Sequence, residues 1–278
     1  MKFSKMQAAG NDFILINGMI EKSSSWNETA KKVCDRHFGV GADGLMFCER
    51  SSKADIKMNY YNSDGSRGEM CGNGIRCFAK FVYDNEIVTK NEFSVETDAG
   101  IKYIKLNIDI SGNIEYLKVD MEKIDFRRKS IPCTIKKENI LEEEIFIKNK
   151  KVVFSSVLMG VPHTTIFVES FDEYDVNEIG RLMEKNDIFP QKTNVNFAKI
   201  IGKDTIMIKT WERGAGRTLA CGTGCCATAA LAHKLGKIKE NKIKLMAEGG
   251  ELFIEIGEDY KITMSGKAET ICHGEFLK

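Results

Sequence analysis

The chain has 278 residues, enough for one large domain or two of ordinary size. Its 41 lysines and arginines nearly balance its 40 aspartates and glutamates, which argues against a nucleic-acid-binding groove or a membrane-surface patch. No stretch approaches the roughly 20 apolar residues that span a bilayer, and the N-terminal residues lack the apolar run of a signal peptide. We therefore expect a cytoplasmic protein that binds neither nucleic acid nor membrane.

Short strands are predicted along the whole chain, because many segments show period-2 alternation or a continuous apolar run. In chain order they are residues 13–17, 54–61, 93–97, 101–106, 151–159, 164–169, 193–200, 205–211, 242–247, 251–256 and 261–265. Apolar residues at helical spacing predict helices over 74–85 and 224–235, with Gly236 capping the second. Residues 26–37 and 175–186 read as more peripheral helices. The fold class is therefore a mixed α+β fold.

The chain repeats itself when it is shifted so that Cys71 falls on Cys221. In that register both copies read Cys-Gly-x-Gly, and the alternating segments 101–106 and 251–256 coincide. Motif, glycine turn and strand pattern in one register indicate an internal duplication that produces two similar lobes. The charge-rich segment 121–151 is the expected boundary.

Cysteine is abundant, and most of the nine cysteines are expected to be free, buried thiols because the protein is predicted to be cytoplasmic. Cys71 and Cys221 differ from the rest, since each immediately precedes a predicted helix. A helix N-terminus lowers the pKa of a thiol and can hold a carboxylate through its N–H groups. Two such thiols suit a two-base epimerisation, in which one removes a proton from Cα and the other returns one to the opposite face.

Alternative chemistries explain less of the pattern. A zinc site could use Cys221, Cys225 and Cys226, but no Cys-x2-Cys pair occurs and adjacent helical cysteines point in different directions. A Cys-His hydrolase with His163 or His37 as base would leave one thiol without a role. No phosphate-binding glycine motif follows a predicted strand. A non-catalytic pair of binding lobes would not explain the thiols.

The chain resembles the diaminopimelate epimerase family over essentially its whole length. The motifs that carry this resemblance are residues 8–16, 36–45, 60–81, 96–101, 159–163, 189–197, 211–224 and 249–252. The resemblance implies interconversion of LL- and meso-diaminopimelate, for lysine and peptidoglycan precursor synthesis, by an isomerase that uses no cofactor and no metal. It also implies a homodimer and an amino acid substrate.

The same resemblance implies particular site residues and a particular architecture. Cys71 and Cys221 match the catalytic cysteines, and His163 and Glu212 match residues that tune the thiols. The substrate-binding positions fall on Asn11, Asn62, Gly72, Asn73, Asn194, Glu212, Arg213, Gly222 and Thr223. Each lobe is expected to be a β-barrel-like sheet around a central helix, with residues 1–122 and the returning strand 267–278 in one lobe and 123–266 in the other. The active site is expected in the cleft between the lobes.

Two departures from the family pattern concern specificity. Val161 stands where an asparagine is expected before Pro162 and His163, and Gly44 stands where some members have glutamine. An alternative is therefore a related cofactor-independent racemase that acts on another amino acid, such as histidine. Arg213, which can bind a distal carboxylate with two hydrogen bonds, favours diaminopimelate.

Overall fold

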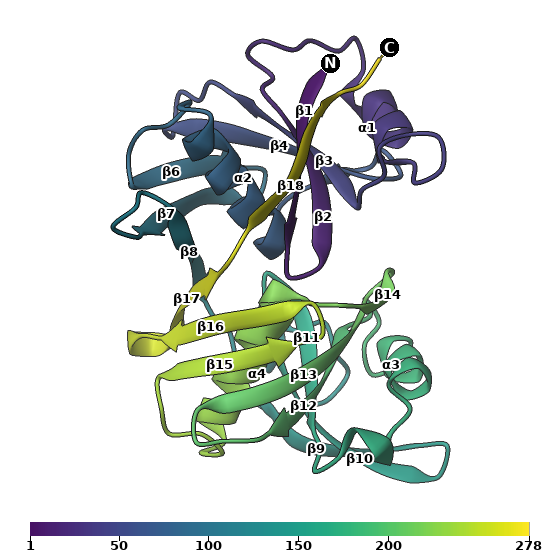
Figure 1. The fold of residues 1–278 in the computed structure, drawn as a ribbon. Helices are drawn as coiled ribbons and strands as arrows, with labels where there is room; N and C mark the ends of the chain where they lie inside the picture. The colour runs from purple at the N-terminus through teal and green to yellow at the C-terminus, as the bar shows by residue number, and fades with distance from the viewer. Residues whose placement is uncertain (278) are drawn as a thin grey trace. The chain divides into compact units, whose positions relative to one another are not determined.

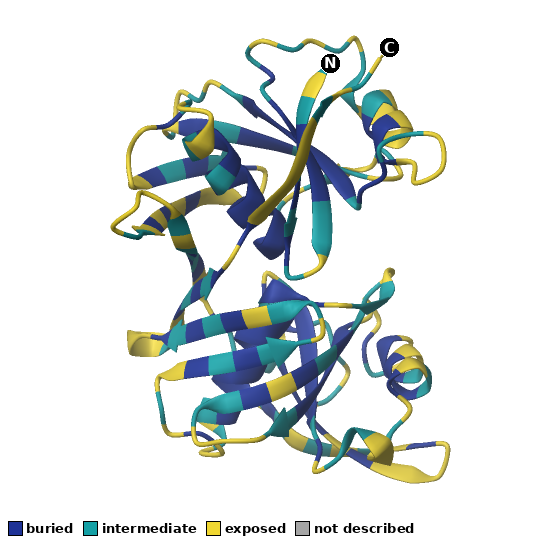
Figure 2. Cartoon of the chain, viewed as in Figure 1, coloured by how far each residue is buried: buried dark blue, intermediate teal, exposed yellow. Residues whose placement is uncertain are grey.

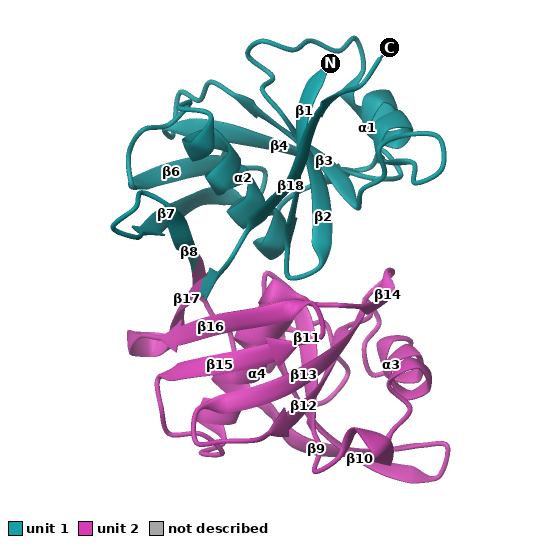
Figure 3. Cartoon of the chain, viewed as in Figure 1, with its two compact units in different colours: residues 1–120, 265–278 teal, residues 121–264 magenta. Residues whose placement is uncertain are grey.

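The computed structural model describes residues 1–277 and divides the chain into two compact units (Figure 3). Unit 1 comprises Met1–Asp120 and the C-terminal segment that begins at Ser265, and unit 2 comprises Met121–Met264. The chain leaves unit 1 along one strand, β8 (Ile114–Lys123), and returns along another, β17 (Lys261–Gly266). No helix within residues 1–277 is long and apolar enough to cross a membrane.

Unit 1 is a mixed sheet with two helices. Its strands pair in the order β18-β1-β2-β3-β4-β6-β7-β8, and the short β5 pairs with β4. The pairs β2–β3 and β4–β6 are parallel, and the others are antiparallel. The remaining elements are β1 (Lys2–Ala8), β2 (Asn11–Ile16), α1 (Trp26–Cys34), β3 (Gly44–Glu49), β4 (Ile56–Asn62), β5 (Arg67–Gly68), α2 (Gly72–Asp84), β6 (Glu92–Thr97), β7 (Gly100–Ile108) and β18 (Glu269–Glu275).

Unit 2 has the same plan. Its strands pair in the order β9-β10-β11-β12-β13-β15-β16, and β14 pairs with β13. The parallel pairs are β11–β12 and β13–β15. The elements are β9 (Ile140–Ile147), β10 (Lys150–Met159), β11 (Val161–Phe167), α3 (Val176–Glu184), β12 (Asn194–Ile200), β13 (Thr205–Glu212), β14 (Gly216–Thr218), α4 (Gly222–Lys234), β15 (Lys242–Ala247) and β16 (Gly250–Ile256), with 3-10 turns η1 (Arg128–Ser130), η2 (Phe171–Glu173) and η3 (Glu258–Tyr260).

The internal duplication is confirmed by the elements themselves. The register that places Cys71 on Cys221 also places α1 on α3, α2 on α4 and β6 on β15 with identical bounds. The residue after the C-cap of the central helix is left-handed in both copies, with φ of 54° at Glu86 and 68° at Gly236. Glycine is the usual residue at this position because it has no Cβ. The mixed α+β fold of two repeated lobes predicted from the sequence is therefore correct.

The central helices α2 and α4 are mostly buried, whereas α1 and α3 bury one face (Figure 2). In unit 2, α4 contacts β10, β11, β12, β13, β15 and β16. Small residues make this close packing possible, since α4 consists largely of glycine, alanine, cysteine and threonine. Each central helix is thus the core element around which its own sheet is built.

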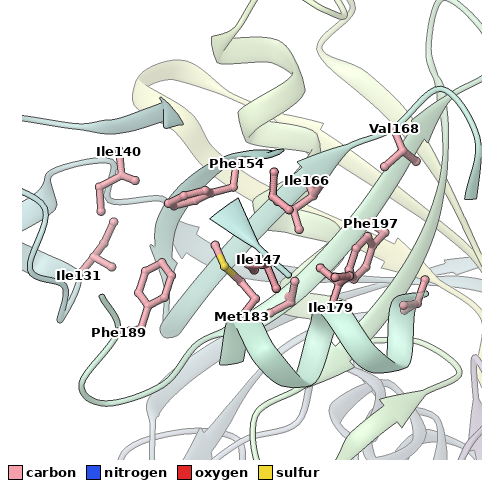
Figure 4. Close-up of a cluster of buried hydrophobic side chains, with 13 residues drawn as sticks. Ile131, Ile140, Ile147, Phe154, Ile166, Val168, Ile179, Met183, Phe189 and Phe197 are labelled. Carbon is pink, nitrogen blue, oxygen red and sulfur yellow. The ribbon is translucent and has the colours of Figure 1, made fainter. Parts of the chain in front are cut away.

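A hydrophobic cluster joins α3 to the sheet of unit 2 (Figure 4). Ile179 and Met183 of α3 lie in it with Phe197 of β12 and Phe189 of the loop that follows α3. Trp211 of β13 packs against the cluster and is partly buried. The helix that was predicted to be peripheral is therefore fixed to the strands that carry part of the candidate site.

The two chain ends lie side by side in unit 1 (Figure 1). The strand β18 pairs antiparallel with β1, and the N-terminal amine donates to the carbonyl of Phe276 at 2.8 Å. Several strands escaped the sequence analysis, namely β1, β3, β8, β9 and the short β5 and β14. The central helices also begin at Gly72 and Gly222, two residues earlier than predicted, so the catalytic cysteine candidates become N-cap residues.

Candidate active site

Cys71 is the N-cap residue of α2, with extended backbone dihedral angles. Its sulfur accepts a hydrogen bond from the Gly74 N–H at 3.4 Å, and its thiol donates to Asn11 Oδ1 at 3.5 Å. The side chain is half-buried. The predicted site residues Asn11 and Cys71, which are far apart in the sequence, are therefore in direct contact.

A network of charged side chains fixes the orientation of Asn11. Asn11 Nδ2 donates to the carboxylate of Asp43, which also accepts from Arg36 at 2.8 Å. Arg36 forms two further bonds to Asp12, at 2.9 and 3.2 Å. Because the amide nitrogen is held by Asp43, the amide oxygen is directed to the thiol of Cys71. Asp43 was not recognised as a site residue, although it lies in the family motif 36–45.

The other predicted residues of unit 1 lie at the C-terminal end of β4 and at the N-terminal end of α2. Asn62 ends β4, where it accepts from the hydroxyl of Tyr60 at 2.6 Å and donates to Ser66 at 2.9 Å. Gly72 and Asn73 form the first turn of α2 and are buried. Asn73 Oδ1 accepts from Arg76 at 2.9 Å.

Arg76 is a fully buried arginine one turn into α2. It donates to the carbonyl of Gly72 at 2.8 Å and to the carbonyl of Lys267 at 3.3 Å, in addition to Asn73. The guanidinium thus fixes the first turn of α2 and the segment that leads into β18. An arginine between the apolar residues Ile75 and Cys77 was the sequence feature that could have revealed it.

Cys221 is the N-cap residue of α4 and is buried. Its sulfur lies 3.3 Å from the hydroxyl of Thr223. Burial, followed by the nearby carboxylate of Glu212, raises the pKa of Cys221 well above the ordinary value of a thiol. Cys221 therefore lacks the lowered pKa expected of a thiol at a helix N-terminus, because burial and Glu212 outweigh the hydrogen bonds from Thr223 and Gly224.

His163 lies in β11 and is fully buried. Its Nδ1 is 3.5 Å from the amide nitrogen of Asn196, so that Nδ1 acts as acceptor and Nε2 carries the proton. Among the described residues Nε2 has no hydrogen-bond partner. Burial, and then the positive charge of Arg213, lowers the pKa of His163 to about 3, so the imidazole is neutral at physiological pH.

Glu212 and Arg213 lie at the end of β13, in the turn that leads to β14. The backbone N–H of Arg213 donates to Asn194 Oδ1 at 2.8 Å, and its guanidinium donates to the carbonyl of Gln191 at 3.0 Å. Asn194 in turn donates to the carbonyl of Pro162 at 3.3 Å. The structure thus brings the predicted residues Asn194 and Arg213 together.

Asn196 is a second residue that the sequence analysis missed. It is fully buried in β12, and its Oδ1 accepts from the hydroxyl of Thr210 at 3.2 Å. A Cβ placed on Gly224 would lie 2.5 Å from the same oxygen. Gly224 is therefore required for packing of α4 on its own sheet. A polar residue within a buried strand was the available indication.

The first turns of α2 and α4 present backbone N–H groups that helix geometry leaves without intrahelical partners. With the partial positive charge of the helix end, these groups form a suitable site for a carboxylate. Within residues 1–277, no group of three or more His, Cys, Asp or Glu side chains is arranged to hold a metal ion. The arrangement supports acid–base chemistry by a thiol next to a bound anion.

Solved structures with a similar fold include enzymes that act on amino acids. A probable proline racemase from Agrobacterium radiobacter K84 has a TM-score of 0.69 at 15% identity, covering 99% of this chain and 92% of that chain. A PhzF-family phenazine biosynthesis protein from Bacillus anthracis has a TM-score of 0.71 at 15% identity, covering 100% and 99%. At such low identity the likeness shows the fold, which is the one shared by these racemase-like and PhzF-like proteins.

Sequence comparison then defines the family. The family model described as diaminopimelate epimerase matches residues 3–126 and 155–271. A diaminopimelate epimerase from Alkaliphilus metalliredigens is 46% identical over 278 residues, covering 100% of this chain and 98% of the relative. The corresponding protein of Clostridium perfringens is also 46% identical, with full coverage of both chains. The chain belongs to the diaminopimelate epimerase family.

Proposed function

We propose that this protein interconverts LL- and meso-diaminopimelate by proton transfer at Cα, as an isomerase in the synthesis of lysine and peptidoglycan precursors. The observation that carries the proposal is the full-length match to relatives named diaminopimelate epimerase, combined with a cysteine at the N-cap of each central helix. Neither thiol is explained by packing alone, since each lies beside polar groups of the predicted site.

In the proposed mechanism Cys71 and Cys221 are the two acid–base groups. One thiolate removes the α-proton, and the other residue, as a thiol, delivers a proton to the opposite face of the planar carbanion. The reverse reaction uses the same two groups with their roles exchanged. The α-carboxylate, bound by first-turn N–H groups of the central helices, accepts the charge that develops on it.

The environment of Cys221 suits this reaction. The α-proton of an amino acid is weakly acidic, so the thiolate that removes it must be a strong base. Burial and the negative charge of Glu212 raise the pKa of Cys221 and thereby strengthen its thiolate as a base. In the protonated state the same group is the acid that the reverse reaction needs. Glu212 and the neutral imidazole of His163 are proposed to tune the thiols.

The remaining predicted residues are proposed to bind the substrate. Arg213, partly exposed at the β13–β14 turn, can take the distal carboxylate with paired hydrogen bonds. Asn11, Asn62, Gly72, Asn73, Asn194, Gly222 and Thr223 supply amide, hydroxyl or backbone groups for the amino acid. We also propose a homodimer in the cytoplasm, where nine free cysteines are chemically stable. Light scattering during size-exclusion chromatography measures the oligomeric state.

The decisive experiment follows proton exchange by NMR. Reduced protein is incubated with LL-diaminopimelate in deuterated water, and loss of the α-proton is recorded together with formation of the meso isomer. We expect both in the wild type, and a loss of about 10²- to 10⁴-fold in Cys71→Ala and Cys221→Ala. Absence of exchange with a folded wild-type protein refutes the substrate assignment. It would direct the search to other amino acids, with Val161 as the first residue to explain.

A further inference from the structure

The turn that carries Glu212 and Arg213 is held by a buried carboxylate from another element. Glu184 is the last residue of α3 and is only 3% exposed. Its Oε2 accepts from the indole Nε1–H of Trp211 at 2.8 Å, and its Oε1 accepts from the backbone N–H of Gly214 at 3.2 Å. Trp211 and Gly214 are the residues on either side of the pair Glu212–Arg213, so Glu184 holds both ends of this segment.

The position of Glu184 is held by the packing of α3 against its neighbours. α3 lies beside β13 and β14 (Figure 1), and it approaches so closely that a Cβ on Gly180 would lie 2.6 Å from the Cβ of Trp211. Ile179 and Met183 anchor the helix in the hydrophobic cluster of unit 2 (Figure 4). A buried carboxylate is costly without its hydrogen bonds, so its two oxygens remain on the donors that they have. Lys192 Nζ, 3.9 Å away and half-exposed, supplies a partial counter-charge.

Unit 1 has no comparable carboxylate. In the register of the duplication Glu184 corresponds to Cys34, which is a buried thiol, and Trp211 corresponds to Tyr61. The turn of unit 1 that corresponds to Glu212–Arg213 carries Asn62 and Ser63. Glu184 and Arg213 therefore occur in the same copy of the repeat, whereas the corresponding positions of unit 1 carry Cys34 and Ser63.

We propose that Glu184 is a positioning residue that, through Trp211 and Gly214, fixes Glu212 relative to Cys221 and directs Arg213 toward the substrate. This inference rests on the proposed function for the role of Arg213, whereas the effect on Cys221 does not depend on which substrate is used. It assigns to α3, an element without a catalytic group, control over both the specificity and the reactivity of this half of the site.

The first test is kinetic and uses two conservative variants. Glu184→Gln keeps one acceptor oxygen but turns an N–H group toward one of its two donors. Trp211→Phe removes the indole N–H donor together with part of the ring. We expect kcat/KM for LL-diaminopimelate to fall by up to about 100-fold in each, mainly through KM, because a displaced arginine binds the distal carboxylate poorly. The double variant should be no worse than the worse single variant, since both substitutions disrupt the same hydrogen bond between Glu184 and Trp211.

Glu178→Gln is the matched control on the same helix. Glu178 is more exposed and bonds to Lys148, away from the turn, so its replacement should leave kcat/KM unchanged. If Glu184→Gln does not fold, the folded Trp211→Phe variant decides, because it removes one of the two donors and keeps an aromatic ring against the cluster. Unchanged kcat/KM in folded Trp211→Phe, or strictly additive losses in the double variant, overturns the proposal.

The second test works without any substrate. Alkylation of Cys221 by iodoacetamide is followed by peptide mass spectrometry as a function of pH. Because Glu212 disfavours the thiolate of Cys221, releasing the turn in Glu184→Gln or Trp211→Phe should move the alkylation profile to lower pH. A shifted profile in an enzyme that is inactive on diaminopimelate supports the positioning role while refuting the substrate. An unshifted profile in both folded variants refutes the positioning role whatever the substrate is.

Discussion

The N-terminus of α2 and that of α4 carry the same Cys-Gly-x-Gly motif but pack against different kinds of side chain. A Cβ on Gly74 would lie 2.0 Å from the terminal methyl of Met46 and 3.2 Å from Phe13. In the register of the duplication, Met46 corresponds to Asn196 and Phe13 corresponds to His163. The first helix end is thus backed by apolar side chains, and the second by a buried polar network.

The difference extends to the charges around the two thiols. Near Cys71 the neutral amide of Asn11 accepts from the thiol, and the buried cation Arg76 lies one turn into the helix. Near Cys221 the carboxylate of Glu212 raises the pKa of the thiol, and Arg76 is replaced in the repeat by Cys226. Duplication therefore preserved the cysteine and the helix end, while the side chains around them diverged.

The strongest test of this asymmetry is Glu212→Gln. Loss of the carboxylate should lower the pKa of Cys221 and so speed its alkylation at pH 7. Epimerisation should slow by about 10²- to 10⁴-fold, because the thiolate of Cys221 becomes a weaker base. The two readouts should move in opposite directions. Glu251→Gln, which removes only a surface ion pair with Lys244, is the control. If alkylation and epimerisation both became slower, Glu212 would act by supporting the local structure and not through its charge.

The second test uses pH and His163. The folded-state pKa is about 3 and the unfolded value is about 6.5, so between these pH values the unfolded chain binds a proton that the folded chain does not. Stability conferred by the neutral imidazole is complete above about pH 6.5 and falls by about 1.4 kcal/mol per pH unit toward pH 3. His163→Phe introduces the residue found at the corresponding position of unit 1, Phe13. Its free energy of unfolding in urea should lack this pH dependence between pH 7 and 4. The same pH dependence of the free energy of unfolding in the wild type and in His163→Phe would contradict this assignment.

The motif glycines provide the third test. Gly224→Ala should destabilise the protein by about 1–3 kcal/mol, because the amide of Asn196 is held by Thr210 and cannot retreat. Gly74→Ala should cost less, since the end of Met46 is flexible. The gain in helix propensity, about 1 kcal/mol, is common to both variants and cancels. Chemical denaturation measures the difference, and an equal or larger loss in Gly74→Ala would contradict the packing argument.

The smallest effect is expected in unit 1 at Asp43. Asp43→Ala releases the amide of Asn11 and should lower kcat/KM by about tenfold, the worth of one hydrogen bond to a charged group. Asp55→Ala, which breaks an ion pair with Lys90 elsewhere in unit 1, should have no effect on kcat/KM. Unchanged kinetics in Asp43→Ala would mean that Asn11 is oriented by other contacts.

The sequence analysis succeeded where the evidence was local or repeated. The central helices were predicted from apolar spacing, and the duplication from motifs in one register. The strands β1, β3, β8 and β9 were missed. β3 is a short apolar run and β8 alternates buried and more exposed residues, so the sequence carried a strand signal that the analysis did not use. Four polar residues were also missed, because their roles depend on hydrogen bonds to residues that are distant in the sequence. They are Asp43, Arg76, Glu184 and Asn196.

The sequence by itself determined the family, the fold class, the duplication and the repeated cysteine near the start of each central helix, because these depend on residue identity and spacing along the chain. Only the tertiary structure decided that Cys221 is a buried, weakly acidic thiol, that His163 is neutral and that Glu184 holds the turn of Arg213. Burial and hydrogen-bond partners set these properties, and both arise when strands distant in the chain close around a helix. The same motif, folded twice, therefore acquired two chemical environments.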